Sequence, residues 1–269
     1  MLDKPIAVPM QRSDGCCRIE FKQRAGLTVV DRLYQAGCCK ARFSAADEAV
    51  LINTAGGLTG GDHLSWTVRL KERTAATITT QACEKIYRSA GGVSAQVETS
   101  LHVEAKVSLF WLPQETILFN GSDLVRRIEA DVADTGELLC LEAIAFGRKA
   151  MGEEVTQARF ADRWRIRLAG RLIHADDLRL EGDVAAQLKR PAIARGGMAI
   201  ATIAFVSRNC EAKVDPVRAC LGEAGGASAF SGKLLARVVA EDSYQLRKIL
   251  CPALECLTDG KPVPKVWAI

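Results

Sequence analysis

The feature that most constrains this chain is a strict alternation of apolar and polar residues. Across residues 97–109 the odd positions are apolar or small, with Thr99 intermediate, and the even positions are polar or charged. Successive side chains of a strand point to opposite faces, so this pattern predicts β-strands with one buried face and one solvent-exposed face. Thirteen residues exceed a usual strand, so we expect one long strand or two strands joined near residues 104–106. Shorter segments alternate in the same way at 64–70, 128–132 and 163–168.

Turn signals separate these segments at short and regular intervals. Short strands at this spacing indicate an all-β stack, sandwich or solenoid, and the chain has no βαβ rhythm. No low-complexity linker divides it, which favours a single β-rich domain over residues 1–269. The turn signals are the glycine-bearing positions 56–57, 60–62, 91–92, 120–121, 134–136, 169–170, 181–183 and 196–197.

Helix signals come late in the sequence. Asp215 followed by Pro216 predicts an N-cap and the first turn of a short helix through Leu221. Ser243 is the expected cap of a second helix, which Pro252 should kink or split. We therefore expect a mainly β fold with two short helical regions toward the C-terminus. The second helix has apolar residues at helical spacing: Leu246, Ile249, Leu250, Ala253, Leu254 and Leu257.

Composition narrows the class of protein. Of the 269 residues 48% are hydrophobic and 25% are charged, which excludes disorder as a description of the whole chain. The net charge of +4 is spread without a run of like charge, so we expect neither a nucleic-acid nor a membrane partner. No apolar run approaches the roughly 20 residues of a membrane-spanning helix. The start at 1–5 has an acid and a proline where a signal peptide is apolar, so we expect a cytoplasmic location.

Several catalytic and metal motifs are missing from the sequence. The ten cysteines contain no C-x-x-C pair, and we expect them to be reduced and mostly buried. The three histidines form no zinc motif, and there is no G-x-S-x-G elbow. No glycine-rich segment has the form of a P-loop, so the chain has no nucleotide-binding motif of that kind.

Four segments have an unusual local composition, rich in glycine, in polar residues or in aromatic residues, and we call them the dense segments. They read NTAGGLTGGD from Asn53, TTQACEKIYRS from Thr79, WLPQETILF from Trp111 and GRKAMGE from Gly147, and the chain ends with KPVPKVW from Lys261. In this order and spacing they resemble the urease accessory protein UreD (UreH) family, from about residue 15 to the end. The cysteine doublets at 16–17 and 38–39 are not part of that resemblance.

The resemblance implies a maturation factor without enzymatic activity. It implies a β-rich, helix-like stack of strands with two helices. It also implies a complex with UreF and the GTPase UreG that docks on the structural subunits of apo-urease, with two copies of this chain in the assembly. That complex drives GTP-dependent delivery of nickel, so no cofactor is bound permanently and Ni²⁺ passes transiently. The absent P-loop agrees with nucleotide chemistry in a partner.

A passage for an ion needs weak ligands along its wall. A tight imidazole or thiolate site would hold nickel, whereas scattered carboxylates, hydroxyls and waters let it enter and leave. The resemblance includes an internal passage lined in this manner. Our hypothesised conduit carboxylates are Asp62, Glu142 and Glu153, with Thr79 and Thr80 as neutral relays. Asp62 is the leading candidate because the glycines beside it leave room for an ion and its water.

Each conduit carboxylate has a structural alternative. Glu142 would simply face solvent on a strand, Glu153 would pair with Arg148, and Asp62 would cap a turn through its own backbone. We expect the segment 111–113 to serve packing and not partner contact.

Two other functions compete with the conduit. One is a β-rich cytosolic hydrolase with Asp62 and His63 as an acid–base pair, although neighbours on a strand point to opposite faces. The other is a protein-binding module without a metal role.

Overall fold

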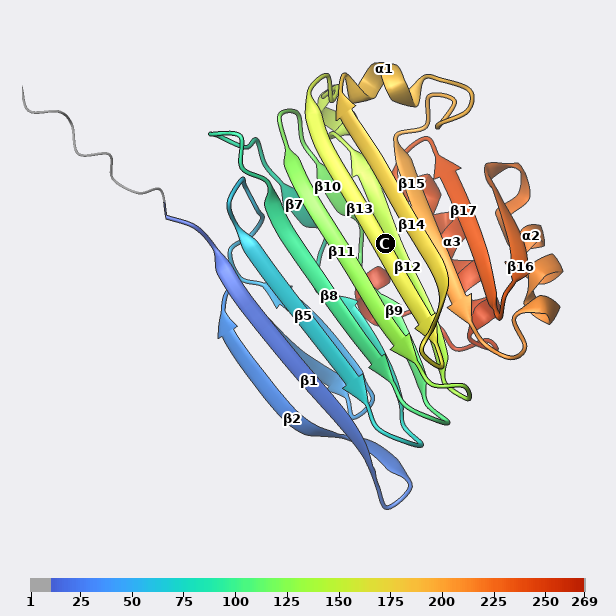
Figure 1. Cartoon of the computed structure of the whole chain (residues 1–269). Helices are drawn as coiled ribbons and strands as arrows, with labels where there is room; N and C mark the ends of the chain where they lie inside the picture. The colour runs from blue at the N-terminus through green and yellow to red at the C-terminus, as the bar shows by residue number, and fades with distance from the viewer. Residues whose placement is uncertain (1–10, 269) are drawn as a thin grey trace, which may run out of the picture.

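The computed structural model describes residues 11–268, and two twisted sheets make up most of it (Figure 1). The expectation about residues 1–5 lies outside the described residues. The first sheet has seven strands in the order β14-β13-β11-β8-β5-β1-β2. Its strands are β1 (Asp14–Arg24), β2 (Leu27–Gly37), β5 (His63–Leu70), β8 (Ala95–Val103), β11 (Asp123–Val132), β13 (Ala158–Leu168) and β14 (Arg171–Gly182).

The second sheet lies behind the first in Figure 1 and has ten strands. Eight of them follow the order β16-β17-β15-β12-β9-β6-β4-β3, while β10 pairs with both β12 and β7. Its strands are β3 (Cys39–Ala45), β4 (Glu48–Asn53), β6 (Ala75–Thr80), β7 (Glu84–Ile86), β9 (Ser108–Leu112), β10 (Thr116–Leu118), β12 (Glu137–Phe146), β15 (Ala199–Val206), β16 (Gly225–Phe230) and β17 (Lys233–Ala240).

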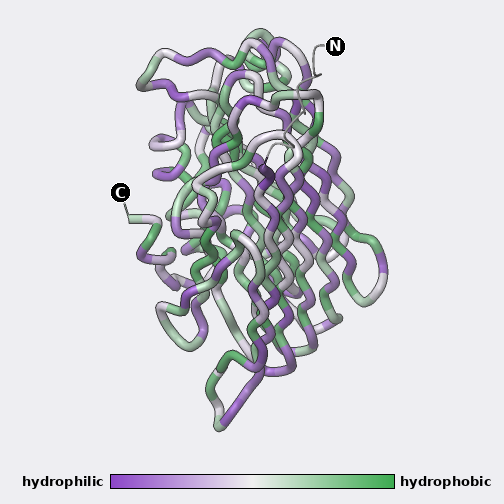
Figure 2. The backbone as a smooth tube through the Cα atoms, turned by 90° about the vertical axis from the view of Figure 1, so that its left-hand side faces the viewer, coloured by the Kyte–Doolittle hydropathy of each residue, from purple (hydrophilic) through white to green (hydrophobic). Residues whose placement is uncertain are grey.

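The chain winds between the two sheets as a solenoid does. From β4 to β13 it passes to one sheet and back, and successive turns stack in parallel: β5 on β8, β8 on β11, and β6 on β9. Only the outer strands, such as β2, β14 and the β15–β17 group, pair antiparallel. The expected β-rich stack is confirmed, and the alternation of apolar and polar residues that predicted it is visible along the strands in Figure 2.

Two apolar cores hold the layers together. One lies between the sheets and contains the inward residues of both, such as Phe21, Leu101 and Trp164. The other lies between the ten-stranded sheet and its helices. That sheet is covered on both faces, so β15 is buried along its whole length and shows no alternation.

The helices agree with the sequence in place and differ in detail. The two expected regions are α2 (Val214–Leu221) and α3 (Ser243–Leu257), and a further helix of five residues, α1 (Val184–Leu188), was not predicted. Four short 3₁₀ turns accompany them at Lys149–Met151, Glu211–Lys213, Gly222–Ala224 and Lys265–Trp267.

The predicted helix caps were wrong by one or two residues. The N-cap of α2 is Lys213, and Asp215 instead pairs with Arg218 at 3.2 Å inside the helix. The cap of α3 is Asp242, whose carboxylate accepts the backbone N–H of Gln245 at 2.9 Å. Pro252 does not split α3, because its ring lies on the exposed face, where water can bond the carbonyl that proline leaves free.

The long alternating segment 97–109 is two strands and not one. Residues 104–107 turn the chain from β8 in the first sheet to β9 in the second, and Lys106 has a positive φ of 58° in that turn. The segment 111–113, which covers the last two residues of β9 and the residue after it, is buried, as expected for packing.

Breaks in the ten-stranded sheet open the space between the layers. Residues 81–83 separate β6 from β7, and residues 113–115 separate β9 from β10. As a result β12 pairs with β9 through Cys140 and with β10 only from Ile144 onward. Glu142 lies in the gap between these two ladders, which is where the polar cavity described next is found.

Within residues 11–268 no helix is both long and apolar enough to cross a membrane. All ten cysteines are unpaired, and Cys17, Cys39, Cys140 and Cys210 are buried.

Candidate functional site

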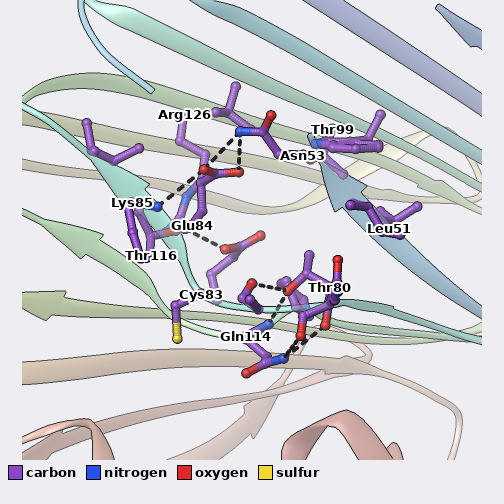
Figure 3. A pocket seen from close by; sticks show the side chains of 18 of the residues that line it. Leu51, Asn53, Thr80, Cys83, Glu84, Lys85, Thr99, Gln114, Thr116 and Arg126 are labelled. Atoms are coloured by element: carbon purple, nitrogen blue, oxygen red, sulfur yellow. Dashed lines mark hydrogen bonds and ion pairs between the residues drawn. The ribbon is translucent and has the colours of Figure 1, made fainter. Parts of the chain in front are cut away.

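A cavity of about 210 Å³ lies between the two sheets, and several polar groups line part of its otherwise apolar wall (Figure 3). Its wall combines apolar side chains of the core with oxygen- and nitrogen-bearing groups from strand ends and from the two breaks in the sheet. The polar wall residues include Asn53, Thr80, Glu84, Thr99, Gln114, Thr116, Arg126 and Glu142.

A buried ion network forms one side of this cavity. The Arg126 guanidinium donates two hydrogen bonds to Asp162, at 3.0 Å from Nε and 2.6 Å from Nη2. Its Nη1 donates to Glu142 and, at 3.3 Å, to the Thr116 hydroxyl. The Trp111 indole N–H adds a hydrogen bond of 3.0 Å to Glu142. One guanidinium therefore holds two carboxylates in the interior.

The electrostatics of this network follow from burial and pairing. Burial raises the pKa of Glu142, and the charge of Arg126 opposes that shift. Burial also opposes the charge of Arg126, but Asp162 and Glu142 outweigh it and raise the pKa of the guanidinium. Arg126 therefore stays charged and takes up much of the ligand capacity of both carboxylates.

Glu84 and Asn53 form a second polar group on the cavity wall. The Asn53 amide donates to both carboxylate oxygens of Glu84, at 3.1 and 3.2 Å (Figure 3). Burial raises the pKa of the Glu84 carboxyl to about 7, against the opposing hydrogen bonds of Asn53 and the Lys85 backbone. Glu84 therefore changes charge near neutral pH.

This raised pKa predicts a pH-dependent stability. Between the ordinary pKa of about 4.5 and the folded value of about 7, the folded chain binds more protons at Glu84 than the unfolded chain. The contribution of Glu84 to stability is therefore present at low pH and is lost as pH rises to 7. Glu84→Gln should flatten this part of the stability–pH curve measured by urea unfolding. Glu129→Gln, at an exposed position of β11, should leave the curve of the parent, and an unchanged curve in Glu84→Gln would contradict the assignment.

The two predicted relay threonines lie on opposite sides of one strand end. The Thr80 hydroxyl accepts the Gln114 backbone N–H at 2.9 Å and lies on the cavity wall. The Thr79 hydroxyl instead accepts the Trp267 indole N–H at 3.1 Å, against the C-terminal segment behind the sheet. The structure thus places Thr80, and not Thr79, on the wall of the cavity that Glu142 also lines.

The other two predicted carboxylates lie among the loops at one end of the stack. The Asp62 carboxylate accepts backbone N–H groups of Ser13 at 2.8 Å and Thr59 at 2.7 Å, so it caps a turn. Glu153 accepts hydrogen bonds from Arg148 at 2.8 Å and from the Asn120 backbone at 3.1 Å. Although burial opposes it, these hydrogen bonds lower the pKa of Glu153.

The structural alternatives raised by the sequence have mixed outcomes. The pair between Glu153 and Arg148 and the turn capped by Asp62 are both present. A solvent-facing Glu142 was wrong, because the residue is 5% exposed. Among residues 11–268 no three His, Cys, Asp or Glu side chains gather as a metal-binding group.

Asp62 and His63 have separate partners. The His63 ring lies 3.2 Å from Asp14 and 3.6 Å from Glu98 on the outer face of the first sheet. Asp62 is buried and already accepts two backbone N–H groups. This geometry gives no support to an acid–base pair.

Sequence reasoning missed Arg126, Asp162 and Glu84. A signal for the first two was present, since each is a charged residue at an inward position of an otherwise apolar register. Arg126 lies between Leu124 and Ile128, and Asp162 lies between Phe160 and Trp164. Glu84 lies in a quoted motif but has no periodic context that sets it apart.

The fold and this site define a solenoid-like β-protein with a cavity between its sheets that polar groups line in part. The chain belongs to the UreD urease accessory protein family, which it matches over residues 13–268. It is 46% identical over 275 residues to a urease accessory protein UreD of Brucella suis, covering 99% of this chain and 98% of the relative. It is 46% identical to that of Agrobacterium fabrum, with 98% and 94% covered. The UreD of Rhizobium johnstonii is 48% identical over 262 residues, with 96% of each chain covered. These relatives are named as accessory proteins, and the resemblance drawn from the motifs is confirmed.

Proposed function

We propose that this chain is a urease maturation factor that helps to deliver nickel to apo-urease and performs no catalysis itself. In this proposal it acts in the cytoplasm with UreF and the GTPase UreG, two copies are present in the assembly, and Ni²⁺ passes as cargo. The observation that carries the proposal is the match to the UreD family over residues 13–268.

The chemistry of the cavity supports a transient path for the ion. Its polar wall offers carboxylates of Glu84 and Glu142, the hydroxyl of Thr80, and the amides of Asn53 and Gln114. Oxygen donors of this kind hold a borderline divalent ion less tightly than imidazole or thiolate. The charge of Glu142 is already paired with Arg126, which weakens its hold on a passing ion further.

Among the described residues that line the cavity, Cys83 supplies the one sulfur, and its chemistry suits the same role. Cys83 lies beside Glu115, to which its thiol donates at 3.3 Å. Burial, and then the neighbouring Glu115 charge, raise the pKa of the Cys83 thiol to about 11. Since the thiolate is the metal ligand, nickel must displace a proton to bind this thiol, which weakens its hold on the ion at neutral pH.

Asp62 is the predicted conduit carboxylate at the loop end of the stack. Its two accepted hydrogen bonds make alanine an ambiguous test, because both would be lost. Asparagine removes the charge and keeps an acceptor oxygen. We expect Asp62→Asn and Asp62→Ala to form the complex with UreF and UreG and to lower urease activation at limiting nickel, as measured by urea hydrolysis.

The matched control for this test is Asp14→Asn, an exposed carboxylate at the same end of the first sheet. It should activate urease as the parent does. Parental activation by both Asp62 variants would remove Asp62 from the conduit.

A second candidate function is a protein-binding module that does not touch metal. The observation that favours it is the pairing of Glu142, Asp62 and Glu153 with donors of this same chain. Nickel binding by the purified chain separates the two functions: calorimetric binding that weakens in Glu84→Gln supports a passage through the cavity. Normal urease maturation by a chain that binds no nickel would support the module.

A further inference from the structure

Three of the dense sequence segments meet at one end of the solenoid, together with the end of a fourth. The Thr59 hydroxyl donates to the carbonyl of Arg88 at 2.7 Å, and the Asn120 backbone N–H donates to Glu153 at 3.1 Å. Residues 53–62, 84–89, 119–121 and 147–153 are thereby brought together from distant parts of the chain. Much of their contact is between backbones and glycines, which leaves several large side chains directed outward.

Tyr87 and Phe119 form an aromatic platform at this end, completed by Arg148. Tyr87 is 44% exposed although its ring packs on Phe119 with centroids 5.2 Å apart. The Arg148 guanidinium lies 4.7 Å from the centroid of Phe119. We call these residues the Tyr87 platform.

The backbone below the platform fits the tyrosine ring closely. A Cβ at Gly57, whose φ is +152°, would lie 2.4 Å from the Tyr87 ring. The ring is therefore held from below by Gly57 and from the side by Phe119. An exposed tyrosine held in this way loses little conformational entropy on binding, which is typical of residues that dominate interface energies.

The two segments that carry Tyr87 and Arg148 also expose an apolar side chain and a positive charge. Met151, in the same 147–153 segment as Arg148, is 73% exposed. Arg88 is exposed, and among residues 11–268 it forms no ion pair. Glu153, the carboxylate of the 147–153 segment, is paired with Arg148. The surface thus offers an aromatic centre, a flexible apolar side chain and a guanidinium without a carboxylate partner.

We propose that the Tyr87 platform, with Arg88 and Met151, is the docking site for a protein partner whose contact surface places carboxylates around an apolar side chain. Arginine binds carboxylates in a bidentate manner, and tyrosine and methionine provide the apolar contact. The site lies next to the cavity along the chain, since Gly56 and Ile86 line the cavity wall and directly precede Gly57 and Tyr87. A partner seated there sits beside that wall.

The experiment measures binding of the full chain to each of UreF, UreG and apo-urease. These three proteins are the partners named in the proposed function, so the inference rests on that function. Two variants, Tyr87→Ala and Arg88→Glu, are compared with the parent by biolayer interferometry. The matched controls are Tyr244→Ala and Lys248→Glu, because Tyr244 is 49% exposed and lies 4.7 Å from the Lys248 ammonium on α3. Thermal unfolding of each variant verifies the fold, and the exposed Arg88→Glu decides the test if Tyr87→Ala unfolds.

We expect both platform variants to weaken binding of the same one partner by at least about tenfold, while both controls bind as the parent does. Parental binding should also weaken as salt rises, and Arg88→Glu should weaken that dependence. Parental binding of all three proteins by Arg88→Glu would overturn the docking site and leave the proposed function standing. If the parent chain binds none of the three, the docking site and the proposed function are both overturned.

Discussion

Replacing Arg126 by methionine is expected to lower the free energy of unfolding by roughly 3–5 kcal/mol. Arg126 is 2% exposed and is the shared partner of Asp162 and Glu142, which are 6% and 5% exposed. Methionine fills a similar volume but leaves both carboxylates buried without a cation. Breaking a buried ion pair on one side is costly, because the remaining charges stay buried without their cation.

Equilibrium urea unfolding followed by circular dichroism measures this loss. Arg127→Met is the matched control, because Arg127 is the next residue of β11 but points outward, where it is 42% exposed and pairs with Glu98 at 3.0 Å. A surface pair of that kind contributes about 0–1 kcal/mol, so the control should stay near the parent. Equal losses in the two variants would contradict the buried network.

A compensating variant separates lost charge balance from lost packing. Adding Asp162→Asn and Glu142→Gln to Arg126→Met removes the stranded charges and keeps groups of nearly the same shape. The triple variant should recover part of the stability lost by Arg126→Met alone. If the triple variant is less stable than Arg126→Met, the burial of carboxylates without a cation is not the cause of the loss.

Removing the C-terminal tryptophan is the second change with a large expected effect. Trp267 is 1% exposed, and its indole N–H donates to the Thr79 hydroxyl at 3.1 Å and to the Leu112 carbonyl at 3.2 Å. The Arg247 guanidinium lies 5.4 Å from its ring. Trp267→Ala should cost about 3–5 kcal/mol, because a large cavity opens between the sheet and α3 and two acceptors lose their donor.

Graded variants distinguish the ring from its N–H group. Trp267→Phe keeps most of the apolar volume and should cost less than Trp267→Ala, while Leu27→Ala at a 67% exposed position should stay close to the parent. The measurement is again urea unfolding. A Trp267→Ala chain as stable as the parent would mean that the C-terminal segment does not hold the second core together.

The strands were predictable because their alternation records which face is buried. The 64–70, 128–132 and 163–168 segments all lie within strands of the first sheet, each with its apolar face against the core. The covered ten-stranded sheet was harder to read, since β12 and β15 are buried on both faces and carry no period of two. The helix caps shifted because capping depends on a local bond that composition alone does not choose.

The cavity could not be predicted from any single segment. It exists because β9 and β10 separate along β12, which is a property of pairing between strands distant in the sequence. Glu142 lies on the cavity wall, and its pairing with Arg126 depends on two strands of different sheets. Asp62 likewise depends on Ser13, which lies 49 residues earlier in the chain.

The nickel content of urease matured without this chain tests the central claim most directly. Urease would be purified from a host lacking this gene at limiting nickel, with UreF and UreG present, and from the same host carrying the gene. The account predicts urease that is largely free of nickel and inactive in the first case, and nickel-loaded and active in the second. Equal nickel content and equal activity in the two preparations would contradict it.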